Sequence, residues 1–131
     1  MIGLDTNVVV RYVAQDDPQQ SPKATAMIES LSADEPGFIT MVSMVELVWV
    51  LQSCYQATKE EVVGVLETIL RTRELVVEQA EIVWQALRCF DGAKADFADC
   101  LIERCASAAG CSHMVTFDKQ AAKAAGMRQL T

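Results

Sequence analysis

The sequence predicts an α/β sandwich with a mainly parallel sheet. Short apolar runs with strand character alternate with helical segments along the chain, and no repeat or linker interrupts them. The strand-like runs are short and mainly apolar, and polar residues do not alternate regularly along them, which favours parallel strands that are buried on both faces of the sheet. The chain has 131 residues, of which 51% are hydrophobic and 22% charged. This size and composition predict one globular domain over residues 1–131.

The predicted elements follow one another in a regular order. Strands are expected at 1–4, 37–40, 74–78 and 113–117, with a further edge strand at 127–130. Helices are expected at 6–14, 19–31, 43–55, 59–73, 79–90, 94–110 and 118–126. At least one helix separates each strand from the next, which is the connection that parallel strands need.

Local residues predict several of the helix ends. Ser21 can cap the second helix, with Pro22 in the first helical position. Thr58 and Glu61 have the spacing of a capping box. Two glycines, Gly110 and Gly126, are expected to end the last two helices.

The composition excludes several kinds of site and suggests a compartment. No apolar stretch approaches the ~20 residues of a membrane span, and the N-terminus does not resemble a signal peptide, so we expect a cytoplasmic protein. The five cysteines are odd in number and form no CxxC pair, which favours reduced thiols packed in the core. His113 is the only histidine, which disfavours a Ser-His-Asp triad or a two-histidine zinc site.

Two aspartates directly follow predicted strands. Asp5 comes after the first strand and Asp118 after the fourth. The carboxyl ends of parallel strands are where α/β sheets bind ligands, so these two residues are candidate site residues. Each also precedes a predicted helix, where an aspartate commonly serves only as an N-cap.

Four further acids lie on predicted helices. Glu46 sits in the apolar run MVSMVELVWVL, where an unpaired carboxylate would be costly to bury, although a Ser43–Glu46 capping box is an alternative. Asp96, Asp99 and Glu103 are spaced i, i+3 and i+7 and therefore share one helical face. That face is either the solvated side of an amphipathic helix or part of a cation site, since like charges at this spacing repel one another.

A shared cation site explains these acids more simply than a separate role for each of them. Carboxylates clustered without histidine or cysteine ligands select a hard cation, and Mg²⁺ or Mn²⁺ is the usual choice. Such ions keep open water positions that suit phosphate chemistry.

Four ordered motifs resemble a known family. IGLDTNVVVRY, TMVSMVELVWVL, KADFADCLI and VTFDK are similar in order and separation to the PIN-domain family, in particular VapC-type toxins of bacterial toxin–antitoxin pairs. The resemblance spans nearly the whole chain. It implies a three-layer α/β/α sandwich whose central parallel sheet gathers acids around Mg²⁺ or Mn²⁺, and an endoribonuclease activity.

The resemblance also implies specific residues, products and partners. Metal-activated water would cleave RNA to leave 5′-phosphate and 3′-hydroxyl ends. A cognate antitoxin and a homodimer are likewise implied. The family acids fall on Asp5, Glu46, Asp99 and Asp118, which would be both catalytic and metal-binding, with Asp96, Thr6, Ser43 and Thr116 as auxiliary residues. Glu103 lies where such toxins often have a small residue and is either an extra acid of the site or simply exposed.

The net charge bears on both the nuclease and its alternative. A total of −7 argues against a broad basic surface for nucleic acid, but setting aside four site acids leaves −3. Candidate phosphate contacts near the motifs are Arg11, Lys94, Arg104, Lys119 and Lys123. The alternative function is a non-cleaving metal-binding or protein-interaction module on the same fold, which the intact set of four acids disfavours.

Overall fold

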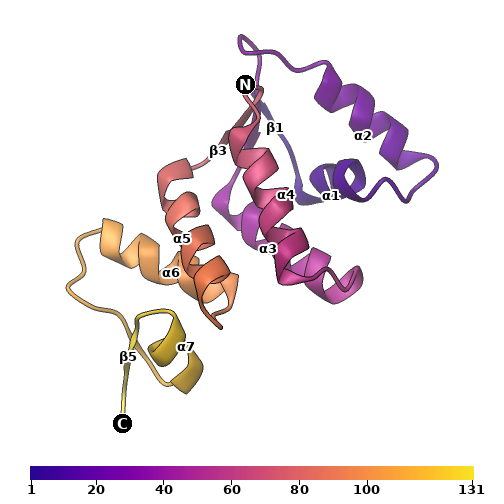
Figure 1. The fold of residues 1–131 in the computed structure, drawn as a ribbon. Helices are drawn as coiled ribbons and strands as arrows, with labels where there is room; N and C mark the ends of the chain where they lie inside the picture. Colours follow the sequence, from indigo (N-terminus) through magenta and orange to yellow (C-terminus); the bar gives the residue numbers. More distant parts are fainter. The chain divides into compact units, whose positions relative to one another are not determined.

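A computed structural model describes all residues, 1–131, and confirms the α/β class (Figure 1). Five short strands alternate with seven helices. The chain divides into two compact units, which we call unit 1 (Met1–Glu78) and unit 2 (Gln79–Thr131), and each is described by itself. The expectation that the chain forms a single domain stays a prediction.

Unit 1 contains a three-stranded sheet in the order β1-β2-β3. Strand β1 (Ile2–Gly3) pairs in parallel with β2 (Gly37–Ile39), and β2 pairs in parallel with β3 (Leu75–Val77). The three strands confirm the predicted ones within one or two residues at each end. Because all three run in the same direction, their carboxyl ends meet at one edge of the sheet.

Four helices connect the strands of unit 1. Helices α1 (Thr6–Ala14) and α2 (Gln20–Glu29) follow β1, and α3 (Met41–Cys54) and α4 (Lys59–Arg71) follow β2. Helix α1 packs against α2 and α3, and α4 packs against α3 and β3. The apolar stripe of α4 is part of the core, where its buried residues are Val62, Leu66 and Ile69.

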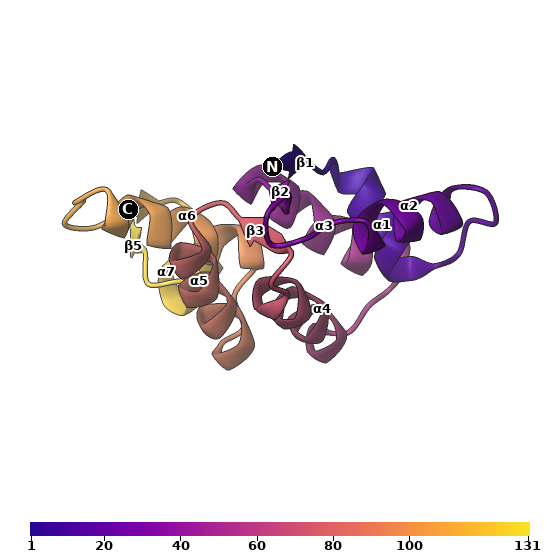
Figure 2. The same cartoon turned by 90° about the horizontal axis from the view of Figure 1, so that it is seen from above.

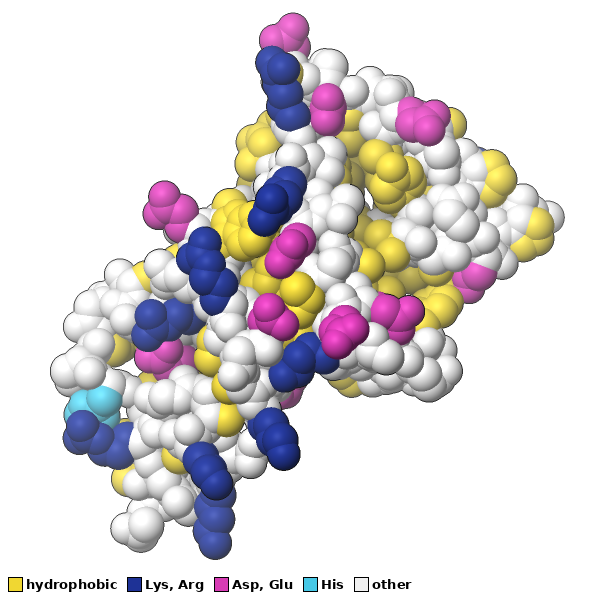
Figure 3. All heavy atoms as spheres, in the orientation of Figure 1, with side chains coloured by type: hydrophobic (Ala, Val, Ile, Leu, Met, Phe, Trp, Pro, Cys, Tyr) yellow, Lys and Arg dark blue, Asp and Glu magenta, His cyan; other side chains and the backbone are white.

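A groove with largely apolar walls of about 820 Å³ runs between α4 and the helices α1 and α2. Figure 3 shows the hydrophobic side chains that gather in this hollow. Val9, Val13 and Ile28 line it from one side, and Val65 and Ile69 line it from α4.

The helix caps of unit 1 confirm one prediction and correct two. Thr58 and Glu61 form the predicted capping box. Helix α3 begins at Met41, two residues earlier than predicted, because the Thr40 hydroxyl accepts the backbone N–H of Ser43. For α2, Asp17 rather than Ser21 accepts the free backbone N–H groups, those of Gln19 and Gln20, at 2.9 and 2.7 Å.

Unit 2 pairs two helices and a small parallel sheet. Helices α5 (Ala80–Gly92) and α6 (Phe97–Ala108) pack closely, and Phe90 meets Phe97 edge-on at 5.9 Å between ring centroids. Strands β4 (Val115–Thr116) and β5 (Arg128–Gln129) pair in parallel and are connected by α7 (Lys119–Ala124). Figure 2 shows these three helices grouped at the C-terminal end of the chain. The predicted edge strand is confirmed as β5.

Glycines end the two last helices, as predicted. Gly110 and Gly126 have φ angles of +99° and +78°, in the left-handed region that glycine adopts without strain. A residue with a Cβ would be strained at either position, so the chain turns there.

The cysteines are free thiols, as the sequence predicted. Cys100 is buried between α5 and α6, with its sulfur 2.9 Å from that of Cys89. Cys54 and Cys111 are exposed, so the core packing that the sequence favoured for the cysteines does not hold for these two. No helix in the structure has both the length and the apolar character of a membrane span.

Candidate metal site

Asp5 lies at the carboxyl end of β1, at the position the sequence predicted. It is exposed and is the N-cap residue of α1, where its Oδ1 accepts the backbone N–H of Thr6 at 2.8 Å. Asp5 therefore serves as an N-cap, as the alternative interpretation of the sequence allowed. The cap uses only one carboxylate oxygen, so Oδ2 stays available to a ligand.

Glu46 comes from α3 and meets the start of α1. The Thr6 hydroxyl donates a hydrogen bond of 2.8 Å to Glu46 Oε1, across 40 positions of sequence. The Ser43–Glu46 capping box is wrong, since Thr40 caps this helix. Glu46 is also exposed, and its neighbours Val42 and Trp49 are 70% and 63% exposed, so no burial cost arises.

Asp5 and Glu46 share one pocket of about 650 Å³ in unit 1. The pocket extends from the first turn of α1 along α3 to its C-terminal end. Three of its polar residues were not singled out from the sequence: Asn7, Asp16 and Tyr55. Asn7 lies within the motif IGLDTNVVVRY, but nothing in the sequence indicated Asp16 or Tyr55. The full lining is Asp5, Thr6, Asn7, Val10, Arg11, Asp16, Glu46, Val50, Cys54 and Tyr55.

Asp99 is the electrostatic centre of the acids in unit 2. It lies half-buried in the first turn of α6, and Asp96 is the N-cap residue of the same helix. Burial raises the pKa of Asp99 above its ordinary value, and the neighbouring charges of Asp96 and Asp118 raise this pKa further. Asp99 is therefore close enough to feel the negative charges of both Asp96 and Asp118.

Asp118 follows β4 and caps α7. Its Oδ1 accepts the backbone N–H groups of Gln120 and Ala121 at 2.7 and 3.1 Å, and the Thr116 hydroxyl accepts the N–H of Asp118 at 3.1 Å. As for Asp5, the capping alternative holds for one oxygen. Thr116 thus orients the turn that carries the acid.

Glu103 and Ser43, two further candidate site residues, have surroundings that differ from those of Asp99. Glu103 accepts a hydrogen bond of 2.7 Å from Arg104 Nε, and this bond raises the pKa of Arg104. Its charge is therefore matched locally, unlike that of Asp99. The hydroxyl of Ser43 makes no hydrogen bond, although it lies one turn before Glu46 on α3.

The donor chemistry fits a hard divalent cation in part. Asp5 and Glu46 in unit 1, and Asp96, Asp99 and Asp118 in unit 2, offer only carboxylate oxygens, the ligands that Mg²⁺ and Mn²⁺ prefer. Within either unit, however, no three Asp, Glu, His or Cys side chains are arranged to hold a metal ion together. That the four acids meet at one site stays a prediction.

Comparison with known proteins agrees with the motif pattern. The PIN domain family model matches residues 2–127, which include all four candidate acids. The chain is 25% identical over 117 residues to a VapC ribonuclease of Aquifex aeolicus (strain VF5), covering 89% of this chain and 87% of that protein. This chain therefore belongs to the PIN-domain family.

Proposed function

We propose that this protein is a Mg²⁺- or Mn²⁺-dependent endoribonuclease and the toxin of a type II toxin–antitoxin pair. Its family and its similarity to a VapC ribonuclease support a toxin ribonuclease in general. The arrangement of its carboxylates supports the metal-dependent chemistry.

The observation that carries this proposal is the placement of acids at the carboxyl ends of parallel strands in both units. Asp5 follows β1 and Asp118 follows β4. Each is joined by another acid from a neighbouring helix, Glu46 through Thr6 and Asp99 through its electrostatic interaction with Asp118. The carboxyl ends of parallel strands are the binding edge of α/β sheets.

We infer that Asp5, Glu46, Asp99 and Asp118 act together at one metal site. Asp5 and Asp99 would be the chief ligands of the cation, with Glu46 and Asp118 completing the set and Asp96 assisting. When bound, Mg²⁺ or Mn²⁺ supplies Lewis acidity that polarises the scissile phosphate and makes a nearby water more acidic. The repulsion of Asp99 by Asp96 and by Asp118 supports this assignment, because a cation bound beside Asp99 would relieve it.

The side chains of the protein then orient the reactants. Thr6 fixes one oxygen of Glu46, which leaves Glu46 Oε2 free for a ligand or a water. Water loses a proton as it adds to the phosphorus in line with the leaving 3′-oxygen, the P–O3′ bond breaks, and the 3′-oxygen takes up a proton. The products are a 5′-phosphate and a 3′-hydroxyl, and the RNA 2′-hydroxyl takes no part as a nucleophile.

The remaining partners are part of the same proposal. RNA is the substrate, and a cognate antitoxin regulates the enzyme by inserting a segment into the acidic site, with a basic side chain among the acids. We also propose a homodimer in the cytoplasm. The free thiols are compatible with a reducing compartment.

The test is cleavage of a mixed RNA pool by the purified protein with Mg²⁺ and with chelator. Asp5→Asn and Asp99→Asn remove one acid from each unit, and Glu60→Gln, an exposed acid on α4, is the matched control for loss of a negative charge. The expected result is Mg²⁺-dependent cleavage that both site variants abolish and the control retains. Ends should ligate as 5′-phosphates and extend as 3′-hydroxyls.

Two results would overturn the proposal. Cleavage that persists in chelator or in both site variants would reject the metal mechanism. Absence of cleavage with every divalent metal tested, in a protein that still binds the antitoxin encoded beside it, would favour the non-cleaving interaction module instead.

A further inference from the structure

Arg11 lies beside Tyr55 in the unit 1 pocket. The pocket that holds Asp5 and Glu46 is also lined by Arg11 and Tyr55, and Arg11 is the one lysine or arginine in its lining. Along α3 the pocket runs from Glu46 to Cys54, which is a rise of about 12 Å for eight residues of helix. This length accommodates a nucleotide next to a phosphate held at the acids.

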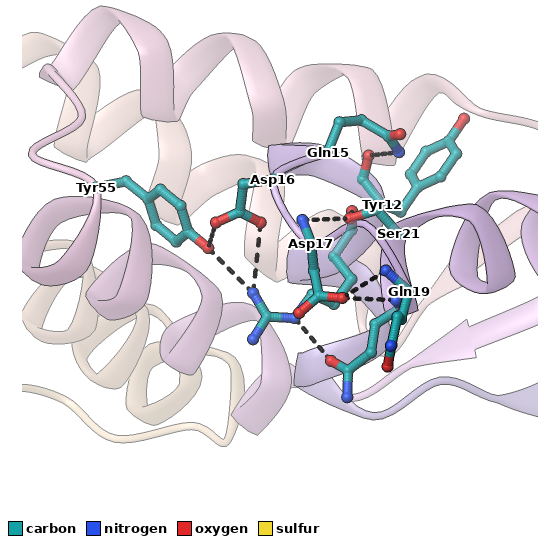
Figure 4. Close-up of polar contacts among 9 residues, drawn as sticks. Tyr12, Gln15, Asp16, Asp17, Gln19, Ser21 and Tyr55 are labelled. Carbon is teal, nitrogen blue, oxygen red and sulfur yellow. Dashed lines mark hydrogen bonds and ion pairs between the residues drawn. The ribbon is translucent and has the colours of Figure 1, made fainter.

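A network of hydrogen bonds holds the Arg11 guanidinium in place. Its Nε donates to Gln20 Oε1 at 2.8 Å, and its Nη1 lies 3.3 Å from the Tyr55 hydroxyl and 3.4 Å from Asp16 Oδ1. The Tyr55 hydroxyl in turn donates to Asp16 Oδ2 at 2.8 Å. Figure 4 shows Tyr55 and Asp16 side by side in this network. The guanidinium is therefore oriented before any ligand arrives, which lowers the entropy cost of binding one.

The network leaves Arg11 able to bind an anion. The ion pair with Asp16 is long at 3.4 Å, and the Asp16 side chain is 44% exposed, so it competes weakly with a phosphate. The bonds described use Nε and Nη1, which leaves Nη2 for a ligand. Arginine is suited to phosphate because its donors match the spacing of phosphate oxygens.

The surroundings of Arg11 continue the path beyond the pocket. A second hollow of about 290 Å³ is lined by Arg11, Asn7, Gln20 and Lys23. Arg11 thus lines both hollows, and the exposed Lys23 adds a second cation in the smaller one. Arg11 and Lys23 offer two positive charges along this path, with the carboxylate of Asp16 beside Arg11.

We propose that Arg11 and Tyr55 form a subsite for the nucleotide next to the cleaved bond of single-stranded RNA. Arg11 binds the phosphate of that nucleotide, and the half-buried ring of Tyr55 stacks on its base. Asp16 contacts both side chains and competes with the phosphate for Arg11. This inference rests on the proposed function and adds the residues that hold the RNA strand beside the metal site.

The experiment measures binding of a fluorescein-labelled single-stranded RNA of mixed sequence to the full chain over a range of KCl concentrations. Ca²⁺ replaces Mg²⁺, and the recovered RNA is checked for intact length. In Arg11→Gln the slope of log affinity against log salt should become shallower by about 0.7, the value for one phosphate contact on a single strand. The control Arg73→Gln removes an exposed arginine after α4 and should leave the slope unchanged.

A second pair of variants separates RNA binding from a purely structural role. Asp16→Asn and Arg11→Gln both loosen the same network and should both lower the melting temperature. They should change RNA affinity in opposite directions, because Asp16→Asn frees Arg11 and removes a negative charge near the RNA. Tyr55→Phe should bind RNA much like the wild type, whereas Tyr55→Ala should weaken binding about five-fold or more through lost stacking.

The outcomes distinguish this subsite from the proposed function. An unchanged salt slope in Arg11→Gln, or affinities that fall equally in Arg11→Gln and Asp16→Asn, would overturn the subsite while wild-type binding and cleavage stand. Absence of RNA binding by the wild type would overturn the subsite and the proposed function together.

Discussion

The hydrogen bond between Thr6 and Glu46 makes a quantitative prediction, because it joins α1 to α3 at the proposed site. Thr6→Val removes the hydroxyl but keeps a β-branched side chain of similar size. A hydrogen bond to a charged group contributes ~1.5–3 kcal/mol when it is shielded from water. Since Glu46 is exposed, we expect this 2.8 Å bond to contribute less, about 1 kcal/mol. That loss corresponds to about 4 °C in melting temperature for a chain of this size.

A double-mutant cycle in urea isolates this interaction. The free energy of unfolding is measured for the wild type, Thr6→Val, Glu46→Ala and the double variant, and the coupling energy should be about 0.5–1 kcal/mol. Thr6→Ser, which keeps the hydroxyl, is the control and should retain most of the coupling. A coupling energy of zero within about 0.3 kcal/mol would show that the bond does not link the two helices.

Three further predictions concern single side chains. Asp99→Asn should raise the melting temperature of the metal-free protein at neutral pH, because burial, Asp96 and Asp118 all raise the pKa of Asp99 and so disfavour its charged form. The gain should fade at acid pH, where Asp99 is protonated. No gain at neutral pH would contradict this prediction. Asp17→Ala should destabilise the protein at neutral pH, but not at acid pH. The backbone N–H groups of Gln20 and Gln19 lower the pKa of Asp17 below 3.8. The contribution of Asp17 to the stability of the fold is therefore present above that value and is lost as the pH falls through the folded-state pKa. An equal loss of melting temperature at both pH values would refute this prediction. Leu66→Ala should cost about 2–5 kcal/mol in urea denaturation, because Leu66 is fully buried, and a cost under about 1 kcal/mol would contradict the core described.

Helix and strand positions could be predicted because their signals are local. The Thr58–Glu61 capping box depends only on residues three positions apart, and both side chains adopt the predicted bonds. The same kind of signal failed where two candidate caps competed. Thr40 begins α3 ahead of Ser43, and Asp17 takes the N–H groups that were assigned to Ser21.

Contacts between distant residues could not be predicted in this way. The partner of Glu46 is Thr6, 40 positions away, and this contact depends on how α1 packs against α3. The same holds for Tyr55, which reaches Asp16 only because α3 ends near the turn after α1. The candidate acids could be singled out because each follows a strand or lies in a motif. That they meet stays a prediction, since it depends on the packing of the whole chain.

A crystal structure with Mn²⁺, located by its anomalous scattering, tests the central proposal most directly. We predict one ion site bound by carboxylates of both units, with Asp5 and Asp99 oxygens at about 2.1–2.2 Å from the ion. Ions bound by one unit alone, with Asp5 and Asp99 more than about 10 Å apart, would contradict a shared site, since charges at that distance are largely screened from each other.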